Sequence, residues 1–157
     1  MNTQLSLHFS LKEATDSNKA TENNISNIPS AQIVSVMVKT ASKMEEVRQL
    51  LKQPIDINSW YRCPELNIKV GSKSTSQHLN GEAVDFISPQ FGTPTQIVQY
   101  LKANKDSIGF DQLILEHTWV HISFAILTSK PRGQVLSLLS DKSYAIGITD
   151  IHGNPIN

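Results

Sequence analysis

The chain has 157 residues, which suits one domain with a buried core, and we expect a single domain over residues 1–157. Lysine plus arginine and aspartate plus glutamate number 14 each, so the charge balance predicts no nucleic-acid or anionic-membrane partner. No segment approaches the roughly 18 apolar residues of a transmembrane helix, and the single cysteine, Cys63, excludes an internal disulfide and a thiol-rich metal site.

The N-terminal part predicts two helices separated by a polar loop. The segment from Met1 to Ser6 lacks the charged and apolar regions of a secretory signal, so we expect retention in the cytoplasm unless something releases the protein. A capping box from Ser10 to Glu13 opens a short helix that ends before Asn18, and residues 16–28 predict a surface loop. The main helix is expected over residues 31–52, where apolar residues recur at intervals of three and four: Ile33, Val36, Met37, Ala41, Met44, Val47 and Leu51.

The rest of the chain predicts mainly short strands. Pro54 ends the main helix, and Pro64 stands at the first position of a short helix with Cys63 at the capping position. In chain order we expect strands over 55–60 and 83–87, a helix over 94–105, strands over 111–116 and 119–126, and a hairpin over 135–148. Early helices and late strands favour an α+β fold, with the helices packed on a mostly antiparallel sheet.

One segment carries most of the chemistry: Ser76-Gln77-His78-Leu79-Asn80-Gly81-Glu82-Ala83-Val84-Asp85, answered later by Trp119-Val120-His121. Between His78 and Asp85, the dipeptide Asn80-Gly81 favours a turn that brings both side chains to one point. Asp85 lies within an otherwise apolar strand, where an unpaired carboxylate would be costly, so a cation is its expected partner. Two imidazoles and one carboxylate form a ligand set that holds a catalytic zinc with one coordination position open.

The pattern Ser-x-His-x-x-Gly-x-Ala-x-Asp followed by Trp-Val-His resembles the signature of the zinc D-alanyl-D-alanine peptidases, which include bacterial carboxypeptidases and dipeptidases and phage endolysins. The resemblance to the carboxypeptidase-like branch covers about residues 5–126 and extends to the segments Leu7 to Glu13, Ser59 to Asn67 and Phe110 to Glu116. It implies a hedgehog/DD-peptidase-like fold. It also implies one Zn²⁺ per chain, held by His78, Asp85 and His121.

Three departures from the family pattern are visible. The family usually has Gly-Gly-Ser where this chain has Gly71-Ser72-Lys73, and usually Ser or Thr where it has Cys63. The third departure concerns catalysis. Many members carry an acid, the general base, three residues before the second His ligand, and here that position is Thr118. The nearest carboxylate is that of Glu116.

We expect Glu116 to act as the base in its place. If His117 and Thr118 form a two-residue hairpin loop, Glu116 pairs with Trp119 and shares a sheet face with His121. Diagonal neighbours on one face of a sheet lie within reach of long side chains. The alternative for Glu116 is a solvated carboxylate at the end of a hairpin.

The resemblance implies peptide hydrolysis, in which zinc lowers the pKa of its bound water to about 7 and Glu116 takes the proton. Arg62 is expected to hold the terminal carboxylate of a D-Ala-D-Ala stem, the alternative being a surface arginine. Ser76 is expected either to donate a hydrogen bond to substrate or to shape its loop. Trp119 is expected either to wall the site or to be a core aromatic.

Four further polar residues stay outside the predicted site. His117 is expected to be exposed in its turn, and Glu82 to point away from Asp85 into solvent, because side chains alternate along a strand. His8 and His152 lie outside any motif, and we expect them to be structural or solvated.

The sequence therefore predicts a monomeric zinc peptidase acting on peptidoglycan stem peptides, as a D-Ala-D-Ala carboxypeptidase or an endolysin-type endopeptidase. We expect a phage-encoded lysis or wall-remodelling enzyme, made in the host bacterial cytoplasm and acting on the wall after release or as part of a virion. One alternative, which Thr118 favours, is a non-catalytic zinc-containing domain that binds the wall or builds the virion. Another is a zinc enzyme that acts on other small peptides.

Overall fold

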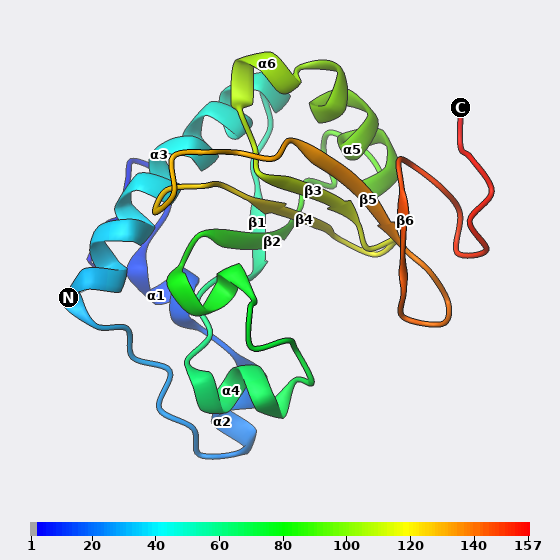
Figure 1. The fold of residues 1–157 in the computed structure, drawn as a ribbon. Helices are drawn as coiled ribbons and strands as arrows, with labels where there is room; N and C mark the ends of the chain where they lie inside the picture. Colours follow the sequence, from blue (N-terminus) through cyan, green and yellow to red (C-terminus); the bar gives the residue numbers. More distant parts are fainter. Residues whose placement is uncertain (1–2) are drawn as a thin grey trace.

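Six strands form one sheet at the centre of the computed structural model, which describes residues 3–157 (Figure 1). Met1 and Asn2, part of the segment that lacks a secretory signal, lie outside the described residues. The strand order is β1-β2-β4-β3-β5-β6, and every neighbouring pair is antiparallel except β3 and β5. The strands are β1 (Asp56–Ser59), β2 (Ala83–Ile87), β3 (Gln112–Leu115), β4 (Val120–Ser123), β5 (Gln134–Leu138) and β6 (Tyr144–Ile146). The predicted α+β class with a mostly antiparallel sheet is confirmed.

The helices begin where the capping signals place them. Ser10 and Thr93 each form a complete capping box, and Ser30 caps the longest helix through a bond from the Ile33 amide. No helix in the described part of the chain is long and apolar enough to cross a membrane. The helices are α1 (Leu11–Thr15), α2 (Asn18–Glu22), α3 (Ala31–Leu51), α4 (Pro64–Lys69), the 3₁₀ helix η1 (Gln77–Asn80), α5 (Pro94–Ala103) and α6 (Lys105–Ile108).

The predicted loop over residues 16–28 is wrong in part, because it contains α2. Ser17 caps this short helix by accepting a hydrogen bond from the Ala20 amide, and Ala20 is buried. The rest of the loop is held by Asn27, whose side chain donates to the Tyr61 carbonyl and accepts from the Cys63 amide at 2.8 Å. A polar, asparagine-rich surface segment is thus anchored by two buried residues, Ala20 and Asn27, which leave no apolar pattern in the sequence.

The two faces of the sheet have different surroundings. One face is apolar and fully buried, and α5 packs on β3 and β4 there, as Figure 1 shows. The opposite face carries polar side chains and lies toward α4 and η1. Side chains alternate between the two faces along each strand. The strand register that places one group of apolar residues on the buried face therefore places Asp85, Ile114 and His121 together on the opposite face. The buried set is Val84, Phe86, Leu113, Leu115, Val120 and Ile122.

The predicted C-terminal hairpin is confirmed as β5 and β6, and an ion pair ties it to the rest of the sheet. The carboxylate of Asp111 accepts bonds from the Arg132 backbone amide at 2.8 Å and from its guanidinium at 2.6 Å. The Asp111 carbonyl accepts from the Gln134 amide, where β5 begins to run parallel to β3. Asp111 therefore fixes where β5 joins β3.

Asp111→Asn is expected to lower the free energy of unfolding by about 1 kcal/mol at neutral pH, since Arg132 is half exposed to screening solvent. Burial raises the pKa of Asp111, but the hydrogen bonds from Arg132 and its charge lower it by a larger amount. The pKa of Asp111 in the folded state is therefore below its usual value. The ionised Asp111 therefore contributes its full share to the free energy of unfolding when the pH is above the pKa that this group has in the unfolded chain. That share is lost as the pH falls through the pKa of the group in the folded protein. Urea unfolding should show a constant difference from pH 7 to about 5 that shrinks in acid. A difference that does not change with pH would indicate lost packing instead of lost charge.

Candidate metal centre

His78 is held by a short, tightly defined turn. It lies in η1, where the Ser76 hydroxyl accepts a bond from the His78 amide at 3.4 Å, and Gly81 ends the helix with φ 73°. A Cβ at Gly81 would lie 2.5 Å from Cγ of Met37 in α3, so this position requires glycine for both its conformation and the close approach of the helix. The predicted turn at Asn80-Gly81 is confirmed.

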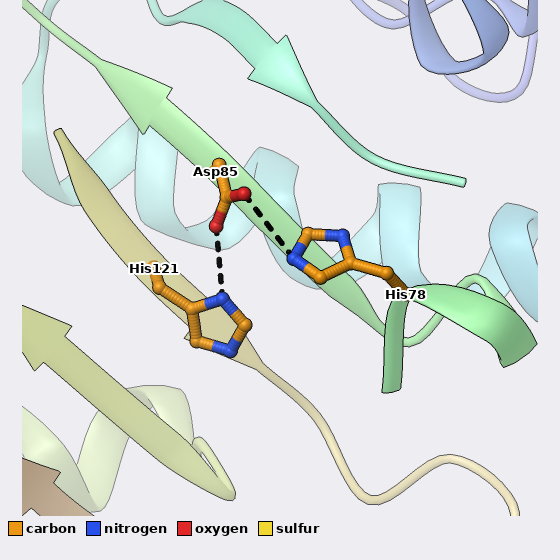
Figure 2. A group of neighbouring side chains, drawn as sticks. All are labelled: His78, Asp85 and His121. Atoms are coloured by element: carbon orange, nitrogen blue, oxygen red, sulfur yellow. Dashed lines mark hydrogen bonds and ion pairs between the residues drawn. The ribbon is translucent and has the colours of Figure 1, made fainter. Parts of the chain in front are cut away.

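The structure brings His78, Asp85 and His121 together from η1, β2 and β4, as Figure 2 shows. The His121 Nδ1 atom lies 2.9 Å from Asp85 Oδ1, and the His78 Nε2 atom lies 3.3 Å from Asp85 Oδ2. One ligand atom from each residue falls within 4.8 Å of the others. Asp85 and His121 are direct cross-strand partners, so the sheet register itself sets their separation.

The hydrogen bonding of His78 leaves a lone pair that a metal ion can satisfy. Its Nδ1 atom lies 2.6 Å from the Trp60 carbonyl, which accepts only, so Nδ1 carries the proton. In the neutral ring Nε2 is then an acceptor that faces the Asp85 carboxylate, another acceptor, and it has no hydrogen-bond partner although it is buried. A metal ion between these atoms removes this conflict. The arrangement of ligand and backbone carbonyl is the one that orients histidine ligands in metal sites.

The pKa shifts of His78 and Asp85 suit metal binding. Burial lowers the pKa of His78, against an opposing effect of Asp85, which favours the neutral ring that metals bind. Burial alone would raise the pKa of Asp85, but His78 and His121 lower it well below the usual range, so the carboxylate is ionised. With no thiol nearby, the nitrogen and oxygen donors fit Zn²⁺ and leave a coordination position for water or substrate.

Glu116 lies where the predicted hairpin places it. The Glu116 amide donates to the Trp119 carbonyl, and Ile114 pairs with His121, so Glu116 shares the sheet face of the metal ligands. Burial raises the pKa of its carboxyl group, and the nearby Asp85 charge adds to this effect against that of His121. The expectation that His117 is exposed is wrong: the residue is half-buried, and its Nε2 atom lies 2.8 Å from the Leu138 carbonyl.

Arg62 lies close to the same group of residues. Its amide donates to the His78 carbonyl at 3.1 Å, and its half-buried guanidinium has a buried Nε atom without a partner. Burial lowers the pKa of this group, while the neighbouring carboxylates of Asp85 and Glu116 raise it. The guanidinium therefore lies near the carboxylates of the site and has one buried donor without a partner. The substrate-binding role of Arg62 stays a prediction.

For Ser76 and Trp119 the structure does not decide between a structural role and a role in substrate binding. Ser76 caps η1 and also lines the cavity beside His121, so both roles expected for it remain compatible with its position. Trp119 shares the sheet face of His121, but it does not line that cavity, and its buried indole nitrogen has no hydrogen-bond partner. The substrate-binding roles of these residues stay predictions.

The expectation that Glu82 is solvated is wrong. Glu82 is 4% exposed, and its carboxylate accepts a hydrogen bond from the Leu127 amide at 2.8 Å. It does point away from Asp85, but the chain after β4 returns to cover it. The His8 Nδ1 atom lies 2.8 Å from a carboxylate oxygen of Glu45, and His152 is exposed, as expected for residues outside the site.

Sequence reasoning missed Trp60, a buried residue that hydrogen-bonds to the ligand residue His78 and to Gly81. Its carbonyl accepts from His78, its indole donates to the Gly81 carbonyl at 2.9 Å, and its ring packs against Phe9. Through these bonds one buried residue fixes both the tautomer of His78 and the end of η1. The sequence signals only an apolar residue at the end of a strand, because the decisive partner is a backbone carbonyl.

A cavity of about 840 Å³ opens beside His121. Its lining comes from the loop after α4, from β3 and β4, and from the β5–β6 hairpin. This volume lies within the range of about 300–1,000 Å³ that is typical of ligand sites. The metal centre therefore adjoins a space large enough for a peptide segment.

Comparison with known proteins identifies the part of the chain that carries the site. A family model described as Peptidase M15 matches residues 7–123. The match contains all three residues of the candidate metal centre and also Arg62, Ser76, Glu116 and Trp119, whereas β5 and β6 lie beyond it. No curated protein matches the chain.

Proposed function

Because the chain belongs to the peptidase M15 family, we propose that it is a zinc peptidase that hydrolyses the peptide stems of bacterial peptidoglycan. The family match agrees with the resemblance seen in the sequence, and it supports a metallopeptidase. The observation that carries the proposal is the convergence of His78, Asp85 and His121 beside a large cavity. Cleavage of a D-Ala-D-Ala terminus, or of an internal stem bond, in cell lysis or wall remodelling is the finer form of this proposal.

His78, Asp85 and His121 would hold the zinc ion, which when bound supplies a Lewis acid and lowers the pKa of a water molecule to about 7. Glu116 accepts a proton from the attacking water as its oxygen bonds to the scissile carbonyl carbon. The same carboxyl group then gives that proton to the leaving amine as the carbon–nitrogen bond breaks. The raised pKa of Glu116 suits a group that first accepts and then donates a proton near neutral pH.

A direct assay tests the proposal. Purified peptidoglycan and a synthetic peptide ending in D-Ala-D-Ala are incubated with the zinc-loaded protein, with and without a chelator. Mass spectrometry of the products identifies the cleaved bond and separates carboxypeptidase from endopeptidase activity. Chelator-sensitive release of stem fragments is the expected result. A zinc-loaded protein that cleaves no wall substrate would contradict it.

Arg62→Ala is expected to lower kcat/KM for stem peptides with a free C-terminus, by an amount that corresponds to roughly 2–5 kcal/mol of transition-state binding. The substitution removes the guanidinium that is proposed to pair with the terminal carboxylate of the substrate. An Arg62→Lys variant keeps the charge but loses the planar fork, so it should recover only part of the activity. Amidation of the substrate C-terminus should reproduce the loss in the unchanged protein. Equal rates on free and amidated peptides would instead give Arg62 another role and favour endopeptidase cleavage.

A second candidate function follows from Thr118, which occupies the position of the usual general base. In that case the domain keeps zinc but binds the wall without hydrolysing it, as a wall-binding or virion structural domain. The assay above distinguishes the two functions. Pelleting of the zinc-loaded protein with peptidoglycan, without any product, would support this alternative.

A further inference from the structure

The cavity beside His121 has two walls that differ in origin. One is the loop after α4, which includes Lys73, and the other is the β5–β6 hairpin, which includes Lys142 and Tyr144. Residues of β3 and β4, among them Gln112 and His121, also line the cavity. The hairpin is outside the family match, so this wall is a feature of the chain that family membership does not predict.

Hydrogen bonds tie the backbone of the hairpin to the rest of the sheet. Its first strand pairs with β3, and the Gln112 side-chain amide donates to the Gln134 side chain at 2.9 Å. His117 contacts the Leu138 carbonyl, which joins the hairpin to the loop beside Glu116. At its tip Lys142 adopts φ 70°, and its amide donates to the Leu139 carbonyl. The tip of the hairpin is therefore an ordered turn.

The charges of the cavity lining are all of one sign. Lys73, Arg132 and Lys142 contribute to the lining, which includes no aspartate or glutamate. Arg132 is paired with Asp111, whereas Lys73 and Lys142 form no ion pair with any residue of the described chain. Lys73 also stands at the position where the sequence pattern departs from Gly-Gly-Ser. On a chain with no net charge, this is a local excess of positive charge beside the reaction site.

We propose that Lys73 and Lys142 make this cavity selective for stem peptides that carry a free carboxylate on an internal residue near the scissile bond. The inference rests on the proposed function and names the substrate class of the same site. Two cations from different segments of the lining, both exposed to solvent, attract a carboxylate on the bound peptide and repel a basic side chain at that place. This selection is separate from the recognition of the C-terminus by Arg62.

The test uses two synthetic stem peptides that both end in free D-Ala-D-Ala. In one the internal carboxyl groups are free, and in the other they are primary amides. Binding to the zinc-loaded Glu116→Gln protein is measured by calorimetry, and hydrolysis by the unchanged protein is measured in parallel. The free acid should bind about tenfold more tightly at low salt, with the preference falling at high salt, since each exposed charge pair contributes only a few-fold.

Lys73→Gln and Lys142→Gln should each reduce the preference for the free acid by about threefold and leave binding of the amidated peptide unchanged. Lys102→Gln is the matched control, because Lys102 is an exposed lysine of α5 outside the cavity. Equal binding of the two peptides, or an equal effect of all three substitutions, would overturn the inference. Absence of hydrolysis with the binding preference intact would contradict only the proposed peptidase activity.

Discussion

Glu116→Gln is expected to lower kcat on stem peptides by about two to four orders of magnitude, the usual contribution of general-base catalysis. Glutamine keeps the shape of the side chain but accepts no proton at neutral pH. Glu116 is the carboxylate that the hairpin brings onto the sheet face of His121. Zinc content and melting temperature should not change, because Glu116 is not one of the three ligand residues.

The matched control for this result is Glu65→Gln, which alters an exposed carboxylate in the first turn of α4. Its kcat should equal that of the unchanged protein. Near-normal turnover in Glu116→Gln would remove Glu116 as the base. Thr118→Glu, which restores an acid to the usual position of the family, would then be the informative variant.

His78→Ala is expected to weaken zinc binding by more than about 100-fold and thereby to abolish hydrolysis. Substitution of a residue that only hydrogen-bonds to a metal ligand already lowers metal affinity by about 10–100-fold, and loss of a ligand should cost more. The unchanged protein should contain one zinc per chain after dialysis. His78 contributes a buried Nε2 atom that has no other partner, so nothing else in the described structure compensates for its loss. Elemental analysis of the dialysed proteins measures the effect.

His152→Ala is the control, since His152 is exposed and lies outside the ligand group. It should retain full zinc and full activity. Stoichiometric zinc in His78→Ala would take His78 out of the ligand set. Zinc bound without activity in the unchanged protein would instead favour the wall-binding alternative.

Features with a strong local signal could be predicted from the sequence. The stripe of apolar residues at helical spacing predicts α3 to within one residue of its observed end, and the two-residue loop predicts the pairing of Glu116 with Trp119. Two of the three ligand residues are also local in origin, because a turn at Gly81 and the alternation of β2 suffice to bring His78 and Asp85 together. In these cases short-range geometry determines where the side chains lie.

Features that depend on distant backbone could not be predicted. The burial of Glu82 needs the Leu127 amide, and the support of His78 needs the Trp60 carbonyl. A backbone group leaves no mark in the sequence, so neither partner could be chosen in advance. The basic wall at Lys142 depends in addition on the parallel pairing of β5 with β3, which juxtaposes segments far apart in the chain.

The same parallel pairing has a consequence for solubility. Without β5, the backbone of β3 would present unpaired amides and carbonyls along an apolar strand, the kind of edge that recruits other chains into aggregates. The hairpin moves the open edge outward to β6, which has only three residues and is followed by Gly147 with φ 91°. A short strand that ends in a left-handed glycine is a poor template for further strands. The segment that shapes the cavity thus also protects this edge of the sheet from intermolecular pairing.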